Sequence, residues 1–329
     1  MLRFAVIGAG RIGAVHAATV AGHPRAELAL VADPVPGAAE ALAARHGARA
    51  TTQVDDVYAA RDVDVVVVGS PTPYHVEQIV GSVRAGKAVL TEKPVDLDLA
   101  RVDACLEAVG SDADRVMVGF NRRFDPGVEE LAARAAAGEI GPVEQLVVTS
   151  RDPQGPPASY LAQSGGIFRD MTIHDLDLVR HLLGDVVEVS ATGQRIDPEV
   201  AGLGDFDGAV VTLLAASGAV ATVVNLRHCA SGYDQRVEVV GPLGSLQTDN
   251  HTATSVRFNG ATSTGASGRY LDFFLERYAA AYRAEIDHLV ECLETGKAPS
   301  PSLVDGREAL VLADAATRSA TTGERVRLR

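Results

Sequence analysis

Three glycines near the N-terminus have the spacing of a turn that binds a dinucleotide. Gly8, Gly10 and Gly13 follow a short apolar run and precede a segment of helical pattern. In that context, glycines let backbone N–H groups approach a pyrophosphate at a helix N-terminus. We therefore expect the whole turn to contribute to a cofactor site, namely Gly8, Ala9, Gly10, Arg11, Ile12 and Gly13.

An acidic residue, Asp33, follows at the end of the second apolar run. A carboxylate at this distance from the glycines accepts a hydrogen bond from a ribose 2′-hydroxyl and repels a 2′-phosphate. The sequence therefore predicts NAD, rather than NADP, as the cofactor. The alternative is a glycine-rich turn followed by an ordinary surface aspartate.

Glu92-Lys93-Pro94 follows the fifth predicted strand. A partly desolvated ammonium at Lys93 can stabilise the oxyanion that develops when an alcohol loses hydride. Pro94 ends the strand and is a candidate for a cis peptide bond. A surface ion pair between Lys93 and Glu92 is the alternative. Of 30 basic residues only Lys87, Lys93 and Lys297 are lysines, so a retained lysine is informative.

Asp170 and His174 form a second candidate pair, four residues apart on one face of a predicted helix. The apolar residues of that helix fall on another face. A carboxylate beside an imidazole orients the ring and raises its basicity, and histidine is the usual proton acceptor near neutral pH. The alternative is a helix-capping Asp170 with a solvated His174.

The run from Gly69 to His75 ends the fourth predicted strand on the edge where such folds bind ligands. We expect it to line the nicotinamide half of the cofactor site. For His75, a role as the first residue of a helix is an equal alternative. The further expected cofactor contacts are Ser70, Pro71, Thr72, His75 and Glu92.

Size and composition exclude several protein classes. A chain of 329 residues is long enough for two packed domains. The formal charge of −13 argues against nucleic acid or an anionic membrane as partner. No apolar run is long enough to span a membrane, and the N-terminal run is predicted to be a strand and not a signal peptide, so we expect a cytoplasmic protein. The three widely spaced cysteines suggest neither a metal site nor disulfides.

The pattern of predicted strands and helices changes along the chain. Up to residue 120, short apolar runs alternate with helical segments, which predicts an α/β domain with a doubly wound parallel sheet. From about residue 143, alternating strands with little helix between them predict a large, mostly antiparallel open sheet in an α+β domain, residues 121–300. The stretch 259–268 is expected to be a mobile loop, and residues 301–329 a helix and tail that pack back on the first domain.

Together, these segments resemble the Gfo/Idh/MocA family of oxidoreductases over nearly the whole chain. The resemblance rests on the glycine turn, on Glu92-Lys93-Pro94, on residues 119–126 and on the segment from Asp170 to His174. It implies an N-terminal Rossmann domain. Within the family, residues 164–177 and 233–238 resemble the enzymes that oxidise inositol.

The resemblance also implies roles for individual residues. Lys93, Asp170 and His174 correspond to the catalytic residues of the family, and Arg122 and Tyr233 to residues that hold substrate hydroxyls. Arg151 and Asp152 are possible further substrate contacts, in a loop where the match is weaker. The family implies a homotetramer formed through the open face of the sheet, which would cover an apolar surface.

The expected activity is therefore NAD-dependent oxidation of a secondary hydroxyl of a cyclic polyol, with myo-inositol giving 2-keto-myo-inositol (scyllo-inosose). One alternative is the same chemistry on another inositol isomer or a pyranose sugar, with NAD or NADP. An alternative of another class is a protein that binds the dinucleotide as a sensor without turnover. A base and an activating lysine argue against the sensor, because a binder needs neither.

Overall fold

The computed structural model describes residues 1–328, in two compact units. Unit 1 comprises Met1–Phe124 and Ala280–Leu310. Unit 2 comprises Asp125–Ala279 and the chain from Val311 onward. Among the described residues, no helix combines the length and apolar character needed to cross a membrane.

Unit 1 contains a six-stranded parallel sheet in the order β3-β2-β1-β4-β5-β6. The strands are β1 (Leu2–Ile7), β2 (Ala26–Ala32), β3 (Arg49–Thr51), β4 (Val65–Val68), β5 (Ala88–Thr91) and β6 (Val116–Val118). The strand order reverses between β1 and β4, where ligands bind in doubly wound sheets. The parallel α/β sheet predicted for the N-terminal part is confirmed.

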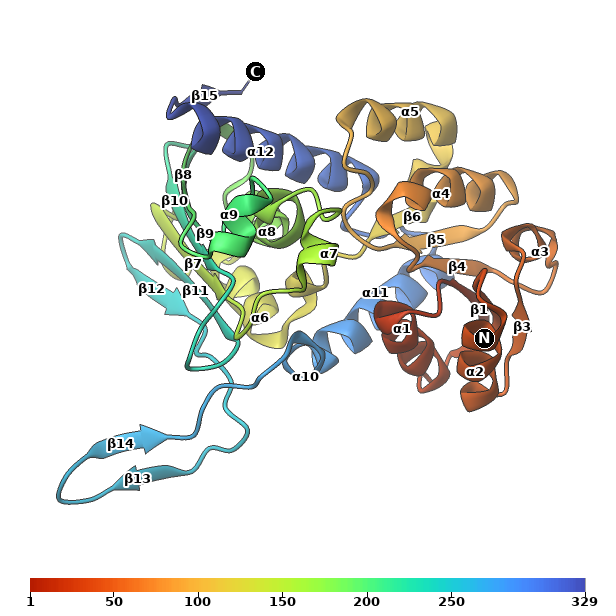
Figure 1. Cartoon of the computed structure of the whole chain (residues 1–329), viewed down its shortest axis with the longest axis horizontal. Helices are drawn as coiled ribbons and strands as arrows, with labels where there is room; N and C mark the ends of the chain where they lie inside the picture. The colour runs from red at the N-terminus through yellow and green to blue at the C-terminus, as the bar shows by residue number, and fades with distance from the viewer. Residues whose placement is uncertain (329) are drawn as a thin grey trace. The chain divides into compact units, whose positions relative to one another are not determined.

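Helices cover both faces of this sheet (Figure 1). They are α1 (Arg11–Ala21), α2 (Pro36–His46), α3 (Val54–Ala59), α4 (His75–Arg84), α5 (Leu99–Val109) and α11 (Ala279–Thr295), with single 3-10 turns at Thr72–Tyr74, Gly110–Arg115 and Asn121–Phe124. Apolar residues of α1, α2 and α11 share one buried cluster with one face of the sheet. Helix α11 comes from far along the chain, so a late segment completes the core of the N-terminal unit.

Unit 2 contains a seven-stranded sheet in the order β12-β11-β7-β10-β9-β8-β15. The strands are β7 (Gln145–Arg151), β8 (Val186–Gln194), β9 (Gly208–Ala215), β10 (Val220–Leu226), β11 (Asp234–Gly241), β12 (Gly244–Gln247) and β15 (Val326–Arg327). Neighbouring strands are antiparallel except β7 and β10, which are parallel. The predicted antiparallel open sheet is therefore confirmed in its main character, with one parallel pair.

The helices of unit 2 are α6 (Pro126–Ala136), α7 (Ala158–Leu161), α8 (Ile173–Leu183), α9 (Pro198–Gly202), α10 (Phe274–Arg277) and the later part of α12 (Leu303–Thr322). Apolar residues of α6, α8 and α12 form one core with the inner face of the sheet. A π-helical turn, Phe168–Thr172, precedes α8. Asp170 therefore lies in a wider turn than the regular helix predicted from residue 170.

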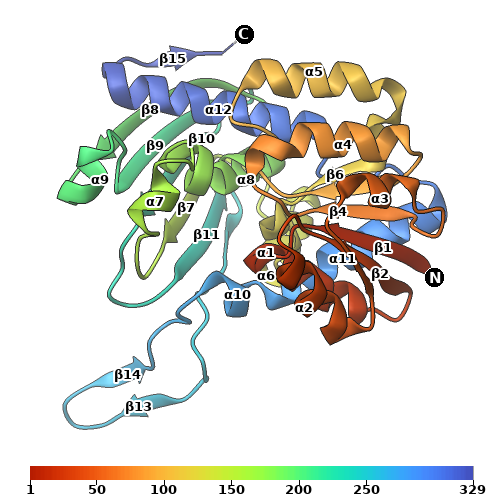
Figure 2. The same cartoon turned by 45° about the vertical axis from the view of Figure 1, so that its right-hand side comes forward.

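Two segments differ from the sequence expectation. Residues 259–268 were expected to be a loop, but strands β13 (Arg257–Asn259) and β14 (Thr264–Ser267) pair as a hairpin that extends from the large sheet (Figures 1 and 2). The C-terminal segment was expected to pack on the first domain. Its part up to Leu310 lies in unit 1, whereas residues Val311 to Leu328 belong to unit 2, where buried Leu312 and Ala316 join the core of the large sheet.

A buried ion pair joins the start of α6 to the end of α10. The guanidinium of Arg277 donates to the carboxylate of Asp125, and the two side chains are only 3% and 2% exposed. The same carboxylate caps α6 by accepting from the backbone N–H of Gly127, at 3.2 Å. A buried charge is stable only with a partner, so each member of this pair depends on the other.

We expect Asp125→Ala to lower the free energy of unfolding by about 3 to 5 kcal/mol, because it removes the partner of the buried Arg277 charge and also removes a helix cap. Denaturant titration followed by circular dichroism measures the loss. The control is Glu139→Ala, which breaks the exposed ion pair with Arg134 and should leave the midpoint almost unchanged. Equal midpoints for both variants would contradict this role of the buried pair.

Candidate functional site

At Gly8 and Gly13, the glycine turn after β1 has no room for a side chain. Gly8 has a φ of 99°, and a Cβ there would lie 2.6 Å from the carbonyl oxygen of Gly69. A Cβ on Gly13 would collide with the carbonyl oxygen of Gly8. Gly10, at the N-terminus of α1, faces open space, and the first turn of α1 has no acidic residue. Such a turn suits an anionic pyrophosphate approaching the backbone.

Asp33, directly after β2, lies beside this turn. One carboxylate oxygen accepts from the backbone N–H of Ala9 at 2.7 Å, and the other accepts from the N–H of Val35 at 2.8 Å. These bonds hold the carboxylate next to the glycine turn. Each oxygen has a further lone pair, so Asp33 can still accept from ribose hydroxyls.

The side chain of His75 connects the loop after β4 with the loop after β5 through hydrogen bonds. This ring is buried, and its two nitrogens lie 2.8 Å from the carbonyl oxygen of Ser70 and 2.9 Å from that of Pro94. The Ser70 hydroxyl donates to Gln78 at 2.6 Å. His75 is the first residue of α4 and connects two strand ends, so the structure gives its ring a positioning role. Pro71 and Thr72 begin the short turn between β4 and α4.

Glu92 directly follows β5, and its side chain points toward α1. Its carboxylate lies 2.7 Å from Nε2 of His16, a fully buried ring on α1. A Cβ added to Gly119 would lie 3.5 Å from the same carboxyl group, so the glycine leaves room for Glu92. Glu92 was predicted as a cofactor contact, whereas its contact with His16 was not predicted. Lys93 follows, half-buried, with a cis peptide bond to Pro94.

A second carboxyl group, Glu285 on α11, lies near Glu92. Glu285 is fully buried, and neither side-chain oxygen has a hydrogen-bond partner among the described residues. Burial, and then the charge of Glu92, hold the pKa of Glu285 well above its ordinary value. Tyr282, one turn earlier on α11, packs edge-on against His16 with ring centres 5.6 Å apart.

The other two lysines lie in surroundings that differ from those of Lys93. The Nζ of Lys87 donates to the carbonyl oxygens of Ala60 and Val63, at 2.6 and 2.9 Å. This side chain is buried, and burial lowers its pKa. Lys297 is exposed, beyond the end of α11. Lys93 is thus the lysine at a carboxyl end of the parallel sheet.

In unit 2, Asp170 is held by two polar side chains. It accepts from the hydroxyl of Tyr160 at 2.8 Å and from the guanidinium of Arg227 at 3.1 Å. Arg227 is 2% exposed and also lies 3.6 Å from Asp205. Partial burial and the charge of Asp170 raise the pKa of Tyr160, so the phenol remains a hydrogen-bond donor. Arg227 keeps Asp170 beside a fixed positive charge.

The predicted substrate residues of unit 2 gather at one edge of the large sheet. Arg151 ends β7 and pairs in register with Leu226 on one side and with Asp234 on the other. The residues next to these three positions are Asp152, Arg227 and Tyr233. Arg151 also donates to Asp234 at 3.1 Å. Strand register therefore brings these polar side chains near the residue that binds Asp170.

His174, half-buried, lies in the first turn of α8, which a buried polar network fastens to the sheet. The next residue, Asp175, accepts from the hydroxyl of Ser150 on β7 and from the amide of Asn225 on β10, both at 2.7 Å. These bonds fix the start of α8 against two strands. The position of His174 is therefore set by its neighbour.

Arg122, predicted to hold substrate, is a buried side chain of unit 1 in the turn after β6. It neighbours Arg123, which donates to Asp305 at 3.1 Å.

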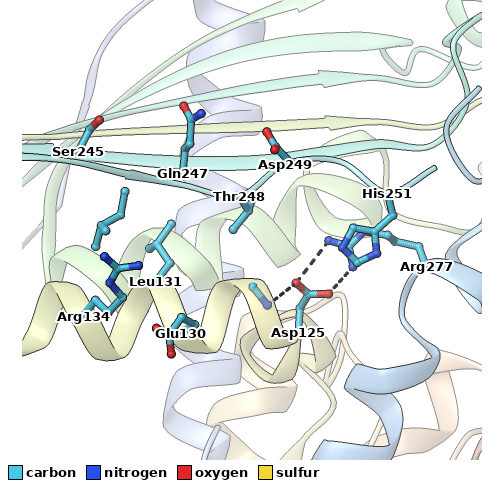
Figure 3. A pocket seen from close by; sticks show the side chains of 12 residues that line it. Asp125, Glu130, Leu131, Arg134, Ser245, Gln247, Thr248, Asp249, His251 and Arg277 are labelled. Carbon is cyan, nitrogen blue, oxygen red and sulfur yellow. Dashed lines mark hydrogen bonds and ion pairs between the residues drawn. The ribbon is translucent and has the colours of Figure 1, made fainter. Parts of the chain in front are cut away.

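A separate cavity of about 520 Å³ lies in unit 2 between α6 and the end of β12 (Figure 3). The Asp125–Arg277 pair forms part of its wall, and none of the sequence-predicted site residues lines it.

Sequence reasoning missed Tyr160, Arg227, Asp205, His16 and Glu285. Arg227 stands at the end of a predicted strand, which was the one available signal for it. No sequence pattern points to His16, Tyr160 or Glu285. The partners of His16 and Arg227 are 76 and 57 residues away, so spacing could not identify these contacts.

Two family models match this chain. Residues 2–120 match the NAD-binding Rossmann-fold domain of the oxidoreductase family named GFO_IDH_MocA. Residues 128–247 match a GFO/IDH/MocA C-terminal domain. Together these models cover most of the sequence.

Similar proteins match over nearly their full length. An inositol 2-dehydrogenase of Rhizobium meliloti is 47% identical over 97% of this chain and 96% of its own. A myo-inositol 2-dehydrogenase of Thermotoga maritima is 38% identical over 99% and 98%.

A solved structure, of a myo-inositol dehydrogenase from Corynebacterium glutamicum, has a TM-score of 0.98, with 48% identity and coverage of 100% of this chain and 99% of that one. A myo-inositol dehydrogenase from Lactobacillus casei, solved with NAD(H) and myo-inositol, has a TM-score of 0.89 at 25% identity, covering 100% and 97%. Sequence, both domain models and fold agree, and the chain belongs to the Gfo/Idh/MocA family of oxidoreductases.

Proposed function

We propose that this protein oxidises a secondary hydroxyl of a cyclic polyol with NAD, and that its substrate is myo-inositol, which it converts to 2-keto-myo-inositol. The observation that carries this proposal is the similarity to inositol dehydrogenases along nearly the entire chain. The geometry supports it, because Asp170 is fixed beside Arg227 and Tyr160 at a sheet edge rich in polar side chains.

The residues of unit 1 fit NAD. The turn from Gly8 to Gly13 would hold the pyrophosphate with its backbone N–H groups, and Asp33 would accept from the ribose. The loop of Ser70, Pro71 and Thr72 would contact the nicotinamide half. When bound, NAD supplies the acceptor for the hydride that leaves the carbinol carbon.

Three side chains carry out the remaining chemistry in this proposal. The ammonium of Lys93 polarises the hydroxyl oxygen and stabilises the charge that develops on it. His174 accepts the hydroxyl proton as the C=O bond forms. Asp170, held by Arg227, orients His174 and favours its protonated form.

Polyol hydroxyls require several polar contacts. We assign these to Arg122, Arg151, Asp152 and Tyr233, whose hydrogen-bonding groups suit a ring that carries a hydroxyl on each carbon. A site built to hydrogen-bond hydroxyls rejects analogues that lack them, because its polar groups are then left unpaired.

We further propose a homotetramer in the cytoplasm, assembled through the outer face of the large sheet. Val147, Thr222 and Thr212 lie opposite one another on that face, as do Val220 and Leu214. Val147, Val210, Leu214 and Val220 are 36–42% exposed. A sheet face with this much exposed apolar surface is typical of an interface between subunits.

The test of the proposed function is NAD reduction, followed by absorbance of the reduced cofactor, with myo-inositol, scyllo-inositol, D-chiro-inositol and glucose. We expect myo-inositol to give the highest kcat/KM. A preference for glucose would contradict the substrate assignment, and no turnover with any of the four would contradict the activity.

We expect Lys93→Ala and His174→Ala each to lower kcat by about 10² or more, because each removes a group that acts in the transition state. NADH binding should persist, and its fluorescence titration is the control for a folded cofactor site. Near-normal turnover in either variant would remove that residue from the mechanism.

We expect Asp33→Ser to weaken the preference for NAD over NADP, because it removes a charge that repels the 2′-phosphate. The ratio of kcat/KM for the two cofactors measures the preference. Asp55→Ser, at an exposed position of helix α3, is the charge-matched control and should not change that ratio. An unchanged ratio for Asp33→Ser would remove Asp33 from cofactor selection.

A further inference from the structure

Two carboxylates in unit 2 share one buried guanidinium. Asp170 lies in the π-helical turn, Asp205 in the loop between α9 and β9, and Arg227 directly after β10. Nη1 of Arg227 lies 3.1 Å from Asp170, and Nη2 lies 3.6 Å from Asp205. The side chains of Asp170, Asp205 and Arg227 are 13%, 10% and 2% exposed. In the proposed mechanism Asp170 and Arg227 have roles, whereas Asp205 has none.

We propose that Asp205 is a positioning residue for Asp170: it shares the Arg227 guanidinium, so that this guanidinium fixes Asp170 without cancelling the negative charge that the reaction needs. The inference rests on the proposed function, in which Asp170 orients His174 and favours its protonated form. Asp205 itself touches neither substrate nor cofactor in this proposal.

The formal charges explain why one carboxylate is insufficient. A carboxylate bound to one guanidinium forms a pair with no net charge, and such a pair favours a nearby imidazolium less than an uncompensated carboxylate does. Two carboxylates and one guanidinium retain one negative charge. Charges interact strongly here, because the three side chains are almost excluded from water. Asp205 therefore allows Asp170 to be held by a cation and still to act as an anion.

The two oxygens of Asp205 have different contacts. Oδ1 accepts from the backbone N–H of Ile167 at 3.0 Å, directly before the π-helical turn that carries Asp170. Oδ2 lies opposite Nη2 of Arg227, and neither of these two buried atoms has a hydrogen bond within residues 1–328. One oxygen therefore binds the backbone, and the other acts on Arg227 through its charge.

Further ionisable groups lie on the segments around this cluster, namely Asp152 after β7, Tyr160 on α7, Asp175 on α8, Arg195 before α9 and Asp207 before β9. Tyr160 donates to Asp170 at 2.8 Å and stays protonated, because burial and then the charge of Asp170 raise its pKa. Arg195 is exposed and donates to the backbone carbonyl of Asp205 at 3.1 Å. All of these groups are retained when Asp205 alone is changed, so the substitution removes a single charge.

The test compares Asp205→Asn with Asp205→Ala. Asparagine keeps the shape and the acceptor for the Ile167 N–H but removes the charge, whereas alanine removes both. Asp249→Asn is the matched control, because it makes the same substitution at an exposed position of unit 2. The measurements are the Tm, KM for NAD, and kcat/KM for myo-inositol from about pH 5 to about pH 10.

We expect Asp205→Asn to lower the plateau of kcat/KM about three- to tenfold and to move its acid limb toward lower pH by about half a unit or more. Without the second carboxylate the imidazolium is less favoured, so His174 is a weaker base that loses its proton at lower pH. Asp205→Ala should show the same movement with a lower Tm. KM for NAD should not change, and Asp249→Asn should match the wild type. A wild-type profile in Asp205→Asn, or an acid limb that moves toward higher pH, overturns the proposal.

The titration of His174 can also be measured without turnover. Carbon-13 labelling of the histidine rings gives an NMR signal for each histidine, and His174→Ala identifies the signal of residue 174. We expect its midpoint to lie at lower pH in Asp205→Asn than in the wild type, because a negative charge has been removed, and to be unchanged in Asp249→Asn. Equal midpoints in the three proteins would contradict the proposal.

The two proposals fail in different ways. If the wild type oxidises none of the polyols, the proposed function is wrong, while the NMR titration still tests the effect of Asp205 on His174. If the wild type is active and Asp205→Asn matches it in both measurements, only the role of Asp205 is wrong.

Discussion

The close approach of the backbone around Gly8 is the constraint on which the first unit depends. Gly8 lies against Gly69, at the point where the strand order reverses, and its carbonyl oxygen lies against Gly13 in α1. No side chain separates the ends of β1 and β4 from the start of α1. The carboxyl ends of β1, β2, β4 and β5 therefore present Asp33, the Ser70 loop and Lys93 at one edge of the same sheet.

In the second unit, the carboxylates of Asp170 and Asp175 are largely buried, and each needs hydrogen-bond donors. Asp170 has a guanidinium and a phenol as partners, and Asp175 accepts from a hydroxyl and an amide. The donors to Asp175 come from β7 and β10, which are adjacent in the sheet, whereas the donors to Asp170 are Arg227, directly after β10, and Tyr160 on α7. The large sheet therefore has two roles. It forms the core, and its strand ends determine which polar groups can reach α8 and the π-helical turn before it.

Much of this arrangement could be predicted from the sequence. The glycine spacing, the strand ends at Asp33 and Lys93 and the change from parallel to alternating strands are local patterns, and the structure confirms both sheets. The contacts between Arg227 and Asp170 and between His16 and Glu92 could not be predicted, since 57 and 76 residues separate the partners. The hairpin of β13 and β14 was missed because glycine, serine and threonine give little strand preference, and pairing across the turn decides its conformation. The joining of Leu312 and Ala316 to the core of the large sheet could not be predicted either, because an apolar helix face does not specify which core it joins.

The scarcity of lysine gives the chain an unusual pattern of amine reactivity. Lys87 is enclosed, with its ammonium bonded to two carbonyl oxygens, and Lys297 is open to solvent. Lys93 is intermediate between them. An acylating reagent added in limited amount would therefore distinguish the three side chains by accessibility, and protection of Lys93 by a bound molecule could be read directly by peptide mass spectrometry.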